Sequence, residues 1–302
     1  MFWENIKEAV TSISSNKMRS LLTMLGIIIG ISSVIIITTI GGSIQSTLTA
    51  TMNSLGGNMV QAYVEARYPE NDEDWATWEQ PEMTDSDYVT QDMIDGLIEK
   101  YPDEVTGVAA QNYLGSGTIK DDADSKNYAN VNIDGITPEY LEYMKLEMHA
   151  GRNLTKADNQ GKKRVCLIAD TMAERYFAGK DPIGETLSVA TSDGGIFDFV
   201  VVGVYVYNQA LFGKVDTSIP EKDRVTELMI PLQTCFKLQG TDRTGYDYFN
   251  LMIDPLADVN QATTDVLSYF DEMYANNKNF HVSAYNMASD LGMINTVLNV
   301  IT

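Results

Sequence analysis

Basic residues are scarce in this sequence: 21 Lys+Arg stand against 42 Asp+Glu, which gives a formal net charge of −21. A protein that binds duplex nucleic acid needs a basic surface to displace counterions, so the composition excludes nucleic acid as an expected partner. In one stretch charge is missing altogether, because no charged residue occurs between Ser20 and Val64. The surface of a soluble domain does not tolerate such a run, and we therefore expect a membrane-attached protein.

Histidines and phosphate-binding motifs are also lacking. His149 and His281 are the only histidines, and neither has a second candidate ligand at metal-binding spacing. No G-x-x-x-x-G-K-[ST] sequence occurs, which excludes a P-loop ATPase on this chain, and no G-x-S-x-G nucleophile motif is present. The acidic runs 70–74 and 121–124 do not fit an EF-hand loop, and we interpret them as solvated loops. The sequence thus predicts no catalytic, cofactor-binding or metal-binding residue.

Cysteine and tryptophan are few, and each leaves two interpretations open. Cys166 and Cys235 are the only cysteines. They could form a disulfide on an oxidising side of a membrane, but the apolar strand VCLIA around Cys166 favours a buried free thiol. Trp75 and Trp78 lie in the acidic loop 69–82. They either fold back on their own domain, which we favour, or bind a ligand or partner.

The uncharged stretch contains a membrane-spanning pattern. Leu21–Ile44 carries no charge, and roughly 20 apolar residues suffice for a helix to cross the hydrocarbon core. A cleaved signal peptide fits less well, because the run is long and no small-x-small cleavage pattern closes it. Lys17 and Arg19 precede the span and the acidic region follows it. The positive-inside rule therefore places the N-terminus in the cytoplasm and the acidic region outside.

Small residues form one face of the predicted span. Gly26 and Gly30 make a G-x-x-x-G pair, and Ser33 continues this face by one turn. Such a face lets another transmembrane helix approach closely. Glycine is also common in membrane helices without this role, and the two interpretations have equal weight.

An amphipathic pattern precedes the span. Phe2, Trp3 and Ile6 begin an apolar stripe that Ala9, Val10 and Ile13 continue at helical spacing. Polar and charged residues lie between them. This pattern predicts a helix on the cytoplasmic membrane surface, held there by the apolar side chains.

Strand and helix patterns alternate in the acidic region. Strands are expected at Met59–Val64, Val105–Tyr113, Ala129–Asp134, Val165–Ala169, Phe197–Tyr207, Glu227–Leu232, Tyr248–Ile253 and Phe280–Tyr285. Helices are expected after Thr90, from Pro138, from a cap at Asp170 to Phe177, and over Ala257–Tyr274. Strands and helices do not alternate strictly, as they do in folds with a parallel sheet, and this order favours an α+β fold. From Asn286 the sequence turns apolar again, and we expect a second membrane helix that continues beyond Thr302.

Several of these segments together resemble a known family. Glu4 with Asn16–Ile35 (NKMRSLLTMLGIIIGISSVI), then Ile40–Gly42 and Ser54–Asn58, resembles the opening of MacB-type ABC transporter permeases, the macrolide-exporter branch of the FtsX-like permease family. Weaker matches follow at Gly151–Leu154, Val165–Ala169, Tyr176–Gly184, Val201–Val204 and Ile230–Pro231. The resemblance covers nearly the whole chain, and its first block is the most specific.

The resemblance implies a domain order. It assigns residues 1–19 to a cytoplasmic amphipathic helix, 20–48 to transmembrane helix 1, 49–285 to an extracytoplasmic MacB-like core domain and 286–302 to the truncated start of transmembrane helix 2. The core domain is expected to be a two-lobed mixed α/β domain. Its porter-like lobe A takes about 49–115 and 246–285, and the inserted lobe B takes about 116–245.

The resemblance also implies a function. We expect a non-enzymatic permease subunit in the bacterial cell membrane, multi-pass in its full length, that exports an antibiotic, peptide or lipid-like substrate. A separate cytoplasmic ABC ATPase would bind ATP and Mg, since Met1 is followed directly by the amphipathic helix. A second permease copy, identical or different, membrane lipid and an extracytoplasmic adaptor protein are the other expected partners. The alternative is an FtsX-like mechanotransmission scaffold that regulates a cell-wall hydrolase; a single-span anchored enzyme has little support from the motifs.

Overall fold

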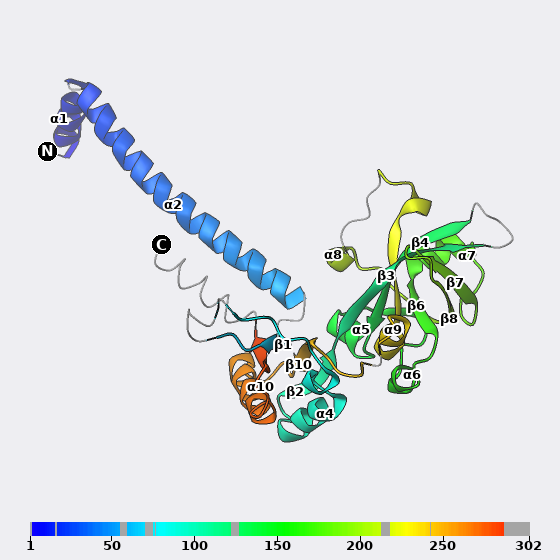
Figure 1. Ribbon diagram of the computed structural model, residues 1–302. Coiled ribbons are helices and arrows are strands. Elements are labelled where there is room, and N and C mark those ends of the chain that lie inside the picture. Colours follow the sequence, from blue (N-terminus) through cyan, green and yellow to red (C-terminus); the bar gives the residue numbers. More distant parts are fainter. Residues whose placement is uncertain are drawn as a thin grey trace. The chain divides into compact units, whose positions relative to one another are not determined.

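The protein forms two compact units in the computed structural model, one ending at Asn53 and one spanning Ser54–Ser289. The structure describes residues 2–15, 17–54, 59–69, 75, 77–121, 127–212, 218–241 and 243–286. The predicted second membrane helix from Asn286 onward lies outside these residues apart from Asn286 itself. Figure 1 shows the helices of the first unit and the two sheets of the second.

Two helices make up the described part of the first unit. Helix α1 spans Phe2–Ser15 and α2 spans Lys17–Ser54, so the predicted N-terminal helix is present. Within α2, Lys17–Ile44 is long and apolar enough to cross a membrane. Several of its hydroxyl groups are bonded inside the helix: Thr23 Oγ1 donates to the carbonyl of Arg19 at 2.8 Å, and Ser33 Oγ to that of Ile29 at 2.7 Å. Such bonds satisfy polar groups that lipid cannot.

A four-stranded antiparallel sheet holds the two ends of the second unit. Its order is β11-β1-β10-β2. The strands are β1 (Met59–Ala66), β2 (Val105–Ala109), β10 (Tyr248–Ile253) and β11 (Phe280–Tyr285). Helices α4 (Gln91–Lys100) and α10 (Val259–Met273) pack on one face of the sheet (Figure 1), and the short helix η1 (Asp85–Asp87) precedes α4.

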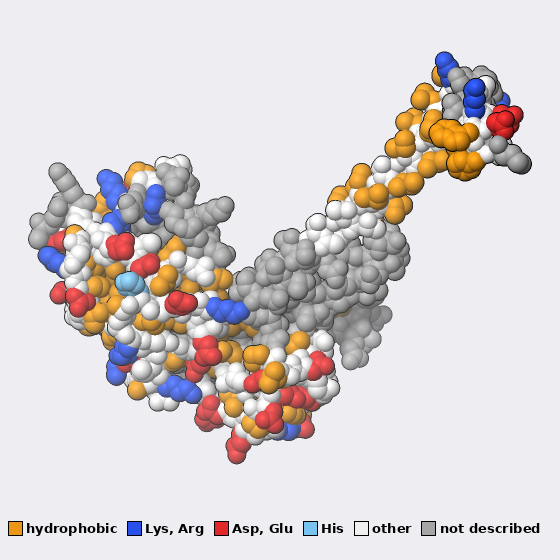
Figure 2. Space-filling view, turned by 180° about the vertical axis from the view of Figure 1, so that it is seen from behind, with side chains coloured by type: hydrophobic (Ala, Val, Ile, Leu, Met, Phe, Trp, Pro, Cys, Tyr) orange, Lys and Arg blue, Asp and Glu red, His pale blue; other side chains and the backbone are white. Residues whose placement is uncertain are grey.

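Alternation along the strands and spacing along the helices produce this core. Val60 and Ala62 point to the helices and are fully buried, as a period of two requires. In α4, Ile94 and Leu97 are buried three residues apart. Thr90 begins α4 as predicted, because its side chain accepts the N–H of Met93 at 3.2 Å. The opposite faces of α4 and α10 are rich in carboxylates, and Figure 2 shows acidic side chains gathered over this lobe.

The second sheet has seven strands in the order β5-β8-β6-β9-β4-β3-β7, and β7 also pairs with β8. This additional pairing closes six strands into a ring and leaves β5 outside it, paired with β8 alone. The strands are β3 (Gln111–Lys120), β4 (Tyr128–Ile136), β5 (Met148–Gly151), β6 (Val165–Ala169), β7 (Thr186–Thr191), β8 (Ile196–Tyr205) and β9 (Val225–Pro231). The helices around them are α5 (Tyr140–Tyr143), α6 (Lys156–Gln160), α7 (Asp170–Phe177), α8 (Gln209–Phe212), η2 (Glu221–Asp223) and α9 (Leu232–Leu238).

Helix α9 belongs to both cores of the second unit. Cys235 lies in the core of the seven-stranded sheet, while Leu232 and Phe236 lie in the core of the four-stranded sheet. The chain also crosses between the sheets at Ala110, whose N–H bonds Thr137 Oγ1 at 3.0 Å. Helix α9 thus joins the two lobes together with two chain crossings, one at Ala110 and one between α9 and β10.

The sheets confirm the expected mixed α/β class and most expected strands, with three corrections. Val105–Tyr113 is two strands in different sheets, because the chain bends at Ala110 to bond Thr137. Helix α7 is capped at Ala169 rather than at Asp170, whose carboxylate instead accepts the N–H of Thr171 and of Tyr207. The helix expected from Pro138 begins only at Tyr140. The division of the lobes near Gly115 and Tyr246 stays a proposal; Gly115 itself lies within β3.

Replacing Gly135 by Ala should destabilise the second unit by about 1–3 kcal/mol, as overpacking does. A Cβ at Gly135 would lie 2.9 Å from Cys235 Sγ and 3.3 Å from the Cα of Leu232, so α9 would have to move off β4. Gly107→Ala is the matched control, because its Cβ would meet only ordinary contacts at 3.5 and 3.7 Å. Chemical denaturation of both variants measures the difference; equal stabilities would contradict the close packing of α9 on β4.

Candidate functional site

The membrane-segment residues singled out in the sequence lie on α1 and α2. Phe2 is 77% exposed and Trp3 80% exposed, and Ile6 is exposed beside them, so these side chains are available to lipid. A Cβ added at Gly26 or Gly30 would meet nothing within 4 Å, so nothing in the described chain fills the small face. Ser33 lies one turn further, and Lys17 and Arg19 stand at the start of α2. The packing, membrane-surface and orientation roles of these residues stay predictions.

The strands at the two ends of the outer unit are neighbours. In the antiparallel pair of β1 with β11, Gln61 lies opposite Tyr285 and Ala66 opposite Phe280. The start of β1 and the end of β11 therefore lie at the same end of the sheet. The chain enters and leaves the outer unit side by side.

Side chains reinforce this pair of strands. Ser283 Oγ of β11 donates to Glu65 Oε2 of β1 at 2.8 Å, and the rings of Tyr63 and Tyr285 meet edge to face at 6.3 Å. Just beyond β1, Arg67 Nε donates to the carbonyl of Phe280 at 3.1 Å. Force applied to either strand would be transmitted to the other through these bonds and through the ladder.

His281 and its neighbours do not form an acid–histidine–serine relay. Such a relay needs the acid to bond one ring nitrogen and the serine the other. Here Ser283 Oγ lies 3.2 Å and Glu65 Oε2 4.0 Å from the same atom, His281 Nε2. Nδ1 of His281 is buried and has no partner among the described residues. His149 is exposed on β5.

The cysteines and tryptophans follow the favoured interpretations. Cys166 and Cys235 are free and buried, and burial raises the pKa of both thiols. Trp78 packs against the core of the four-stranded sheet. Trp75 stacks on Tyr68 at 5.6 Å, although it stays half exposed.

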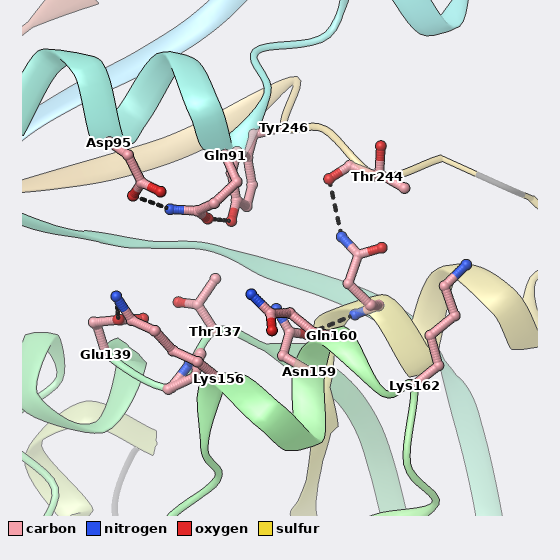
Figure 3. A pocket seen from close by; sticks show the side chains of 12 residues that line it. Gln91, Asp95, Thr137, Glu139, Lys156, Asn159, Gln160, Lys162, Thr244 and Tyr246 are labelled. Atoms are coloured by element: carbon pink, nitrogen blue, oxygen red, sulfur yellow. Dashed lines mark hydrogen bonds and ion pairs between the residues drawn. The ribbon is translucent and has the colours of Figure 1, made fainter.

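A cleft of about 300 Å³ opens between the two lobes of the outer unit (Figure 3). It is lined mainly by polar residues: Gln91, Asp95, Thr137, Pro138, Glu139, Lys156, Asn159, Gln160, Lys162, Gln233, Thr244 and Tyr246. On one wall the hydroxyl of Tyr246 donates to Gln91 Oε1 at 2.6 Å, and Gln91 Nε2 donates to Asp95 Oδ1 at 2.9 Å. Burial raises the pKa of Tyr246, so its hydroxyl stays protonated as a donor.

Helix α6 forms the opposite wall, and a buried carboxylate positions it. The capping box of α6 pairs Thr155 with Asp158, whose side chain is almost fully buried. Arg152 Nη1 and Lys163 Nζ donate to Asp158 at 2.6 and 3.0 Å. Burial alone would raise the pKa of Asp158, but these hydrogen bonds outweigh burial and hold the pKa well below its usual range.

Comparison with known proteins identifies the family. Residues 20–269 match the family described as MacB-like periplasmic core domain. The chain belongs to this family. The resemblance drawn from the opening residues is thereby confirmed, and so is a periplasmic type of domain behind one apolar helix.

Relatives of this MacB-like chain are transporter permeases. It is 25% identical over 301 residues to the uncharacterized ABC transporter permease YknZ of Bacillus subtilis, covering 99% of this chain and 68% of that protein. It is 25% identical over 221 residues to the macrolide export ATP-binding/permease protein MacB of Neisseria gonorrhoeae, covering 71% of this chain and 30% of that protein. The chain therefore spans less than a third of this MacB.

Solved structures of the same kind resemble the fold. The periplasmic region of MacB from Actinobacillus actinomycetemcomitans aligns with a TM-score of 0.49 and 18% identity, covering 83% of this chain and 95% of that one. The extracellular domain of YknZ aligns with a TM-score of 0.47 and 19% identity, covering 75% of this chain and all of that one.

Asp158→Asn should lower the free energy of unfolding of the outer unit by about 2 kcal/mol near neutral pH, because charge-assisted bonds and a cap are weakened. A lowered folded-state pKa gives stability that is fully present above the unfolded pKa of about 3.9 and is lost as pH falls through the folded value. The difference in free energy of unfolding between the parent protein and Asp158→Asn should therefore be constant from pH 5 to 8 and become smaller below about pH 4.

Denaturant titrations across this pH range measure the difference in free energy of unfolding. Asp271→Asn is the control, because Asp271 is exposed on α10. It should change stability by no more than about 0.5 kcal/mol. If the difference in stability between Asp158→Asn and the parent protein increased in acid, the lowered pKa of Asp158 in the folded protein would be contradicted.

Proposed function

We propose that this chain is part of the permease subunit of a MacB-like ABC transporter, which couples ATP hydrolysis elsewhere to motion of the outer domain and so to efflux. The observation that carries the proposal is the pairing of β1 with β11 in a domain of the MacB-like family. One apolar helix leads toward β1, and β11 returns the chain to the same end of the sheet. A domain held this way moves when its tethers move.

The coupling follows from the bonds already described. A displacement of the segment before β1 acts on the ladder with β11 and on the bond of Ser283 to Glu65. The four-stranded sheet then carries the seven-stranded sheet with it, because α9 packs in both cores. The substrate in this proposal is an antibiotic, peptide or lipid-like molecule that the moving domains propel outside the membrane.

The proposal requires partners for this chain. A separate cytoplasmic ABC ATPase would bind ATP and Mg, and a second permease copy would complete the dimer. The relatives support an ATPase partner, since one is named an ABC transporter permease and another an ATP-binding/permease protein. An extracytoplasmic adaptor and membrane lipid are further proposed partners. The complete protein would be multi-pass in a bacterial cell membrane, with the MacB-like domain outside.

Within the membrane we propose a packing role for the small face of α2 and a surface role for α1. Gly26, Gly30 and Ser33 would admit a neighbouring transmembrane helix. Phe2, Trp3 and Ile6 would hold α1 in the cytoplasmic interface, beside the orientation charges Lys17 and Arg19.

Purification of the complete gene product in detergent, together with the products of its neighbouring genes, tests the proposal. We expect an ATPase with a Walker motif to co-purify with the permease and to hydrolyse ATP in the complex. A complete protein that binds no ATPase would contradict the proposal, and capture of a cell-wall hydrolase by the outer domain would instead favour the FtsX-like alternative.

The double variant Gly26→Leu/Gly30→Leu should reduce the ATPase turnover of the reconstituted complex about tenfold, because leucine side chains keep the neighbouring helix away. The outer unit should stay folded, since these positions contact nothing else in the described chain. Ile27→Leu/Ile31→Leu is the matched control, with the same added residue type on the same helix. Turnover in lipid vesicles and circular dichroism give the two measurements; unchanged turnover would remove the glycines from the mechanism.

A further inference from the structure

Three aromatic rings gather on the surface of the four-stranded lobe, just beyond the end of β1. Tyr68 and Trp75 stack with their ring centroids 5.6 Å apart, and Trp78 meets these two rings at 5.3 and 5.6 Å. Trp78 packs against the core, whereas Tyr68 is 50% exposed and Trp75 is 48% exposed. We call these three residues the aromatic cluster. Tyrosine and tryptophan contribute much of the binding free energy in protein interfaces, so neighbouring half-exposed rings are typical of a docking surface.

The aromatic cluster is anchored at both of its ends. The N–H of Arg67 donates to the carbonyl of Asn279 at 2.7 Å, and Arg67 Nε donates to the carbonyl of Asn277 at 3.0 Å. These bonds tie the chain before Tyr68 to the segment that leads into β11. Trp78, packed against the core, fixes the other end. Rings that are positioned in advance lose little conformational entropy when a partner binds.

The aromatic cluster follows the end of β1 that lies away from the tethers. The chain enters the outer unit before Met59, and the last residue of β1, Ala66, lies opposite Phe280 at the start of β11. A strand of eight residues is about 26 Å long, and this length of sheet separates the cluster from the tethers. Here the inference rests on the proposed function: if the tethers hold one end of the sheet at the membrane, the other end is open to a partner outside it.

The charge of the four-stranded lobe selects the chemistry of such a partner. Residues 59–110 and 246–286 contain 20 Asp+Glu and 3 Lys+Arg, a formal net charge of −17, and acidic side chains gather over this lobe (Figure 2). Residues 111–245 contain 19 Asp+Glu and 15 Lys+Arg, a net charge of only −4. Glu79, Glu82 and Asp85, which follow the cluster in the sequence, are exposed. This charge attracts a cationic segment and repels an acidic one.

From these observations we propose that the aromatic cluster is a docking surface for an arginine-rich segment of another extracytoplasmic protein. A guanidinium group stacks on the face of a tryptophan or tyrosine, whereas an ammonium group is more strongly hydrated and stacks less well. The three rings contact one another, so no gap between them can enclose a small cation. Only their outer faces are available, and a chain segment that lies across these faces brings several guanidinium groups to the acidic lobe.

Isothermal titration calorimetry on the full 302-residue chain in an uncharged detergent tests the proposal. The probe is an octapeptide of alternating arginine and alanine, whose acetylated and amidated ends represent a segment of a longer chain. We expect saturable binding that weakens as salt is added. It should be at least about threefold tighter than binding of the lysine–alanine octapeptide with the same charge, because guanidinium groups stack better.

Tryptophan fluorescence locates the bound peptide. In a Trp3→Phe background, Trp75 and Trp78 are the only tryptophans, and the arginine peptide should change their emission with the same midpoint as the calorimetric titration. No ATPase takes part in either measurement, so failure to bind the peptide is distinct from failure of the proposed transport function.

Tyr68→Ala and Trp75→Ala should each weaken binding of the arginine peptide about five- to tenfold, because each removes an exposed ring. Tyr113→Ala is the matched control, since Tyr113 is 53% exposed but lies on β3 of the other lobe. Circular dichroism confirms that each variant is folded.

Glu79→Gln/Glu82→Gln should weaken binding severalfold at low salt, because two carboxylates near the cluster are lost. Glu174→Gln/Glu185→Gln is the matched control, since it removes two exposed carboxylates from the seven-stranded lobe. This control should bind the peptide nearly as tightly as the parent protein.

Four results would overturn the proposal. The first is no heat of binding with the arginine peptide at millimolar concentration. The second is equal binding by the Trp75→Ala and Tyr113→Ala variants, and the third is equally tight binding of the lysine peptide, since charge alone would then explain the binding. The fourth is equally tight binding of argininamide, which would assign a small cation in place of a protein segment.

Discussion

The outer unit depends on the packing of one short helix in two cores. Helix α9 places Cys235 against β4 and the seven-stranded sheet, and Leu232 and Phe236 among the residues under α4 and α10. A helix of seven residues can do this because its side chains point in all directions and both sides are apolar. Gly135 makes the close approach possible, since any Cβ there would meet the side chain of Cys235. Helix α9 therefore links the cores of the two lobes, in addition to the chain crossings at Ala110 and between α9 and β10.

This constraint gives the proposed transport mechanism its physical basis. A tether can move a domain only if the domain responds as a body, and a two-lobed domain needs a stiff joint for that. The ladder of β1 with β11 receives the motion, and α9 passes it to the larger sheet. The same joint shapes the polar cleft, because Gln233 on α9 bonds Thr244 on the return segment. The position of α9 therefore affects both the joint between the lobes and the shape of the cleft.

Local patterns in the sequence were sufficient for the elements whose signals are local. Thr90 as a cap, the alternation of Val60 and Ala62, and the strands at Tyr248–Ile253 and Phe280–Tyr285 are read from a few neighbouring residues. The short strands β5 and β7 and helices α6 and α9 were not expected. Their formation depends on distant partners: β7 pairs with β3 and β8, and α9 packs on Gly135. The break at Ala110 was missed for the same reason, because Thr137, 27 positions away, causes it.

The interlobe cleft could not be predicted from the sequence at all. Its residues come from α4, α6, α9 and the segment before β10, and no motif connects Gln91 with Lys162 or Gln233. The MacB-like family, by contrast, could be predicted, because its most specific residues are contiguous around the membrane span. A family can be identified from motifs of contiguous residues. A site whose residues come together only through tertiary contacts can be found only once the fold is known.

Guanidinium unfolding followed by two probes tests the central claim that α9 makes the outer unit one body. Fluorescence of Trp75 and Trp78, in a Trp3→Phe background, reports the four-stranded lobe. Labelling of the buried thiols of Cys166 and Cys235 reports the core of the seven-stranded lobe, to which both belong. Coincident transitions at one midpoint are the expected result, as for a cooperative unit. Two separate midpoints, with one lobe unfolding while the other stays intact, would contradict the claim.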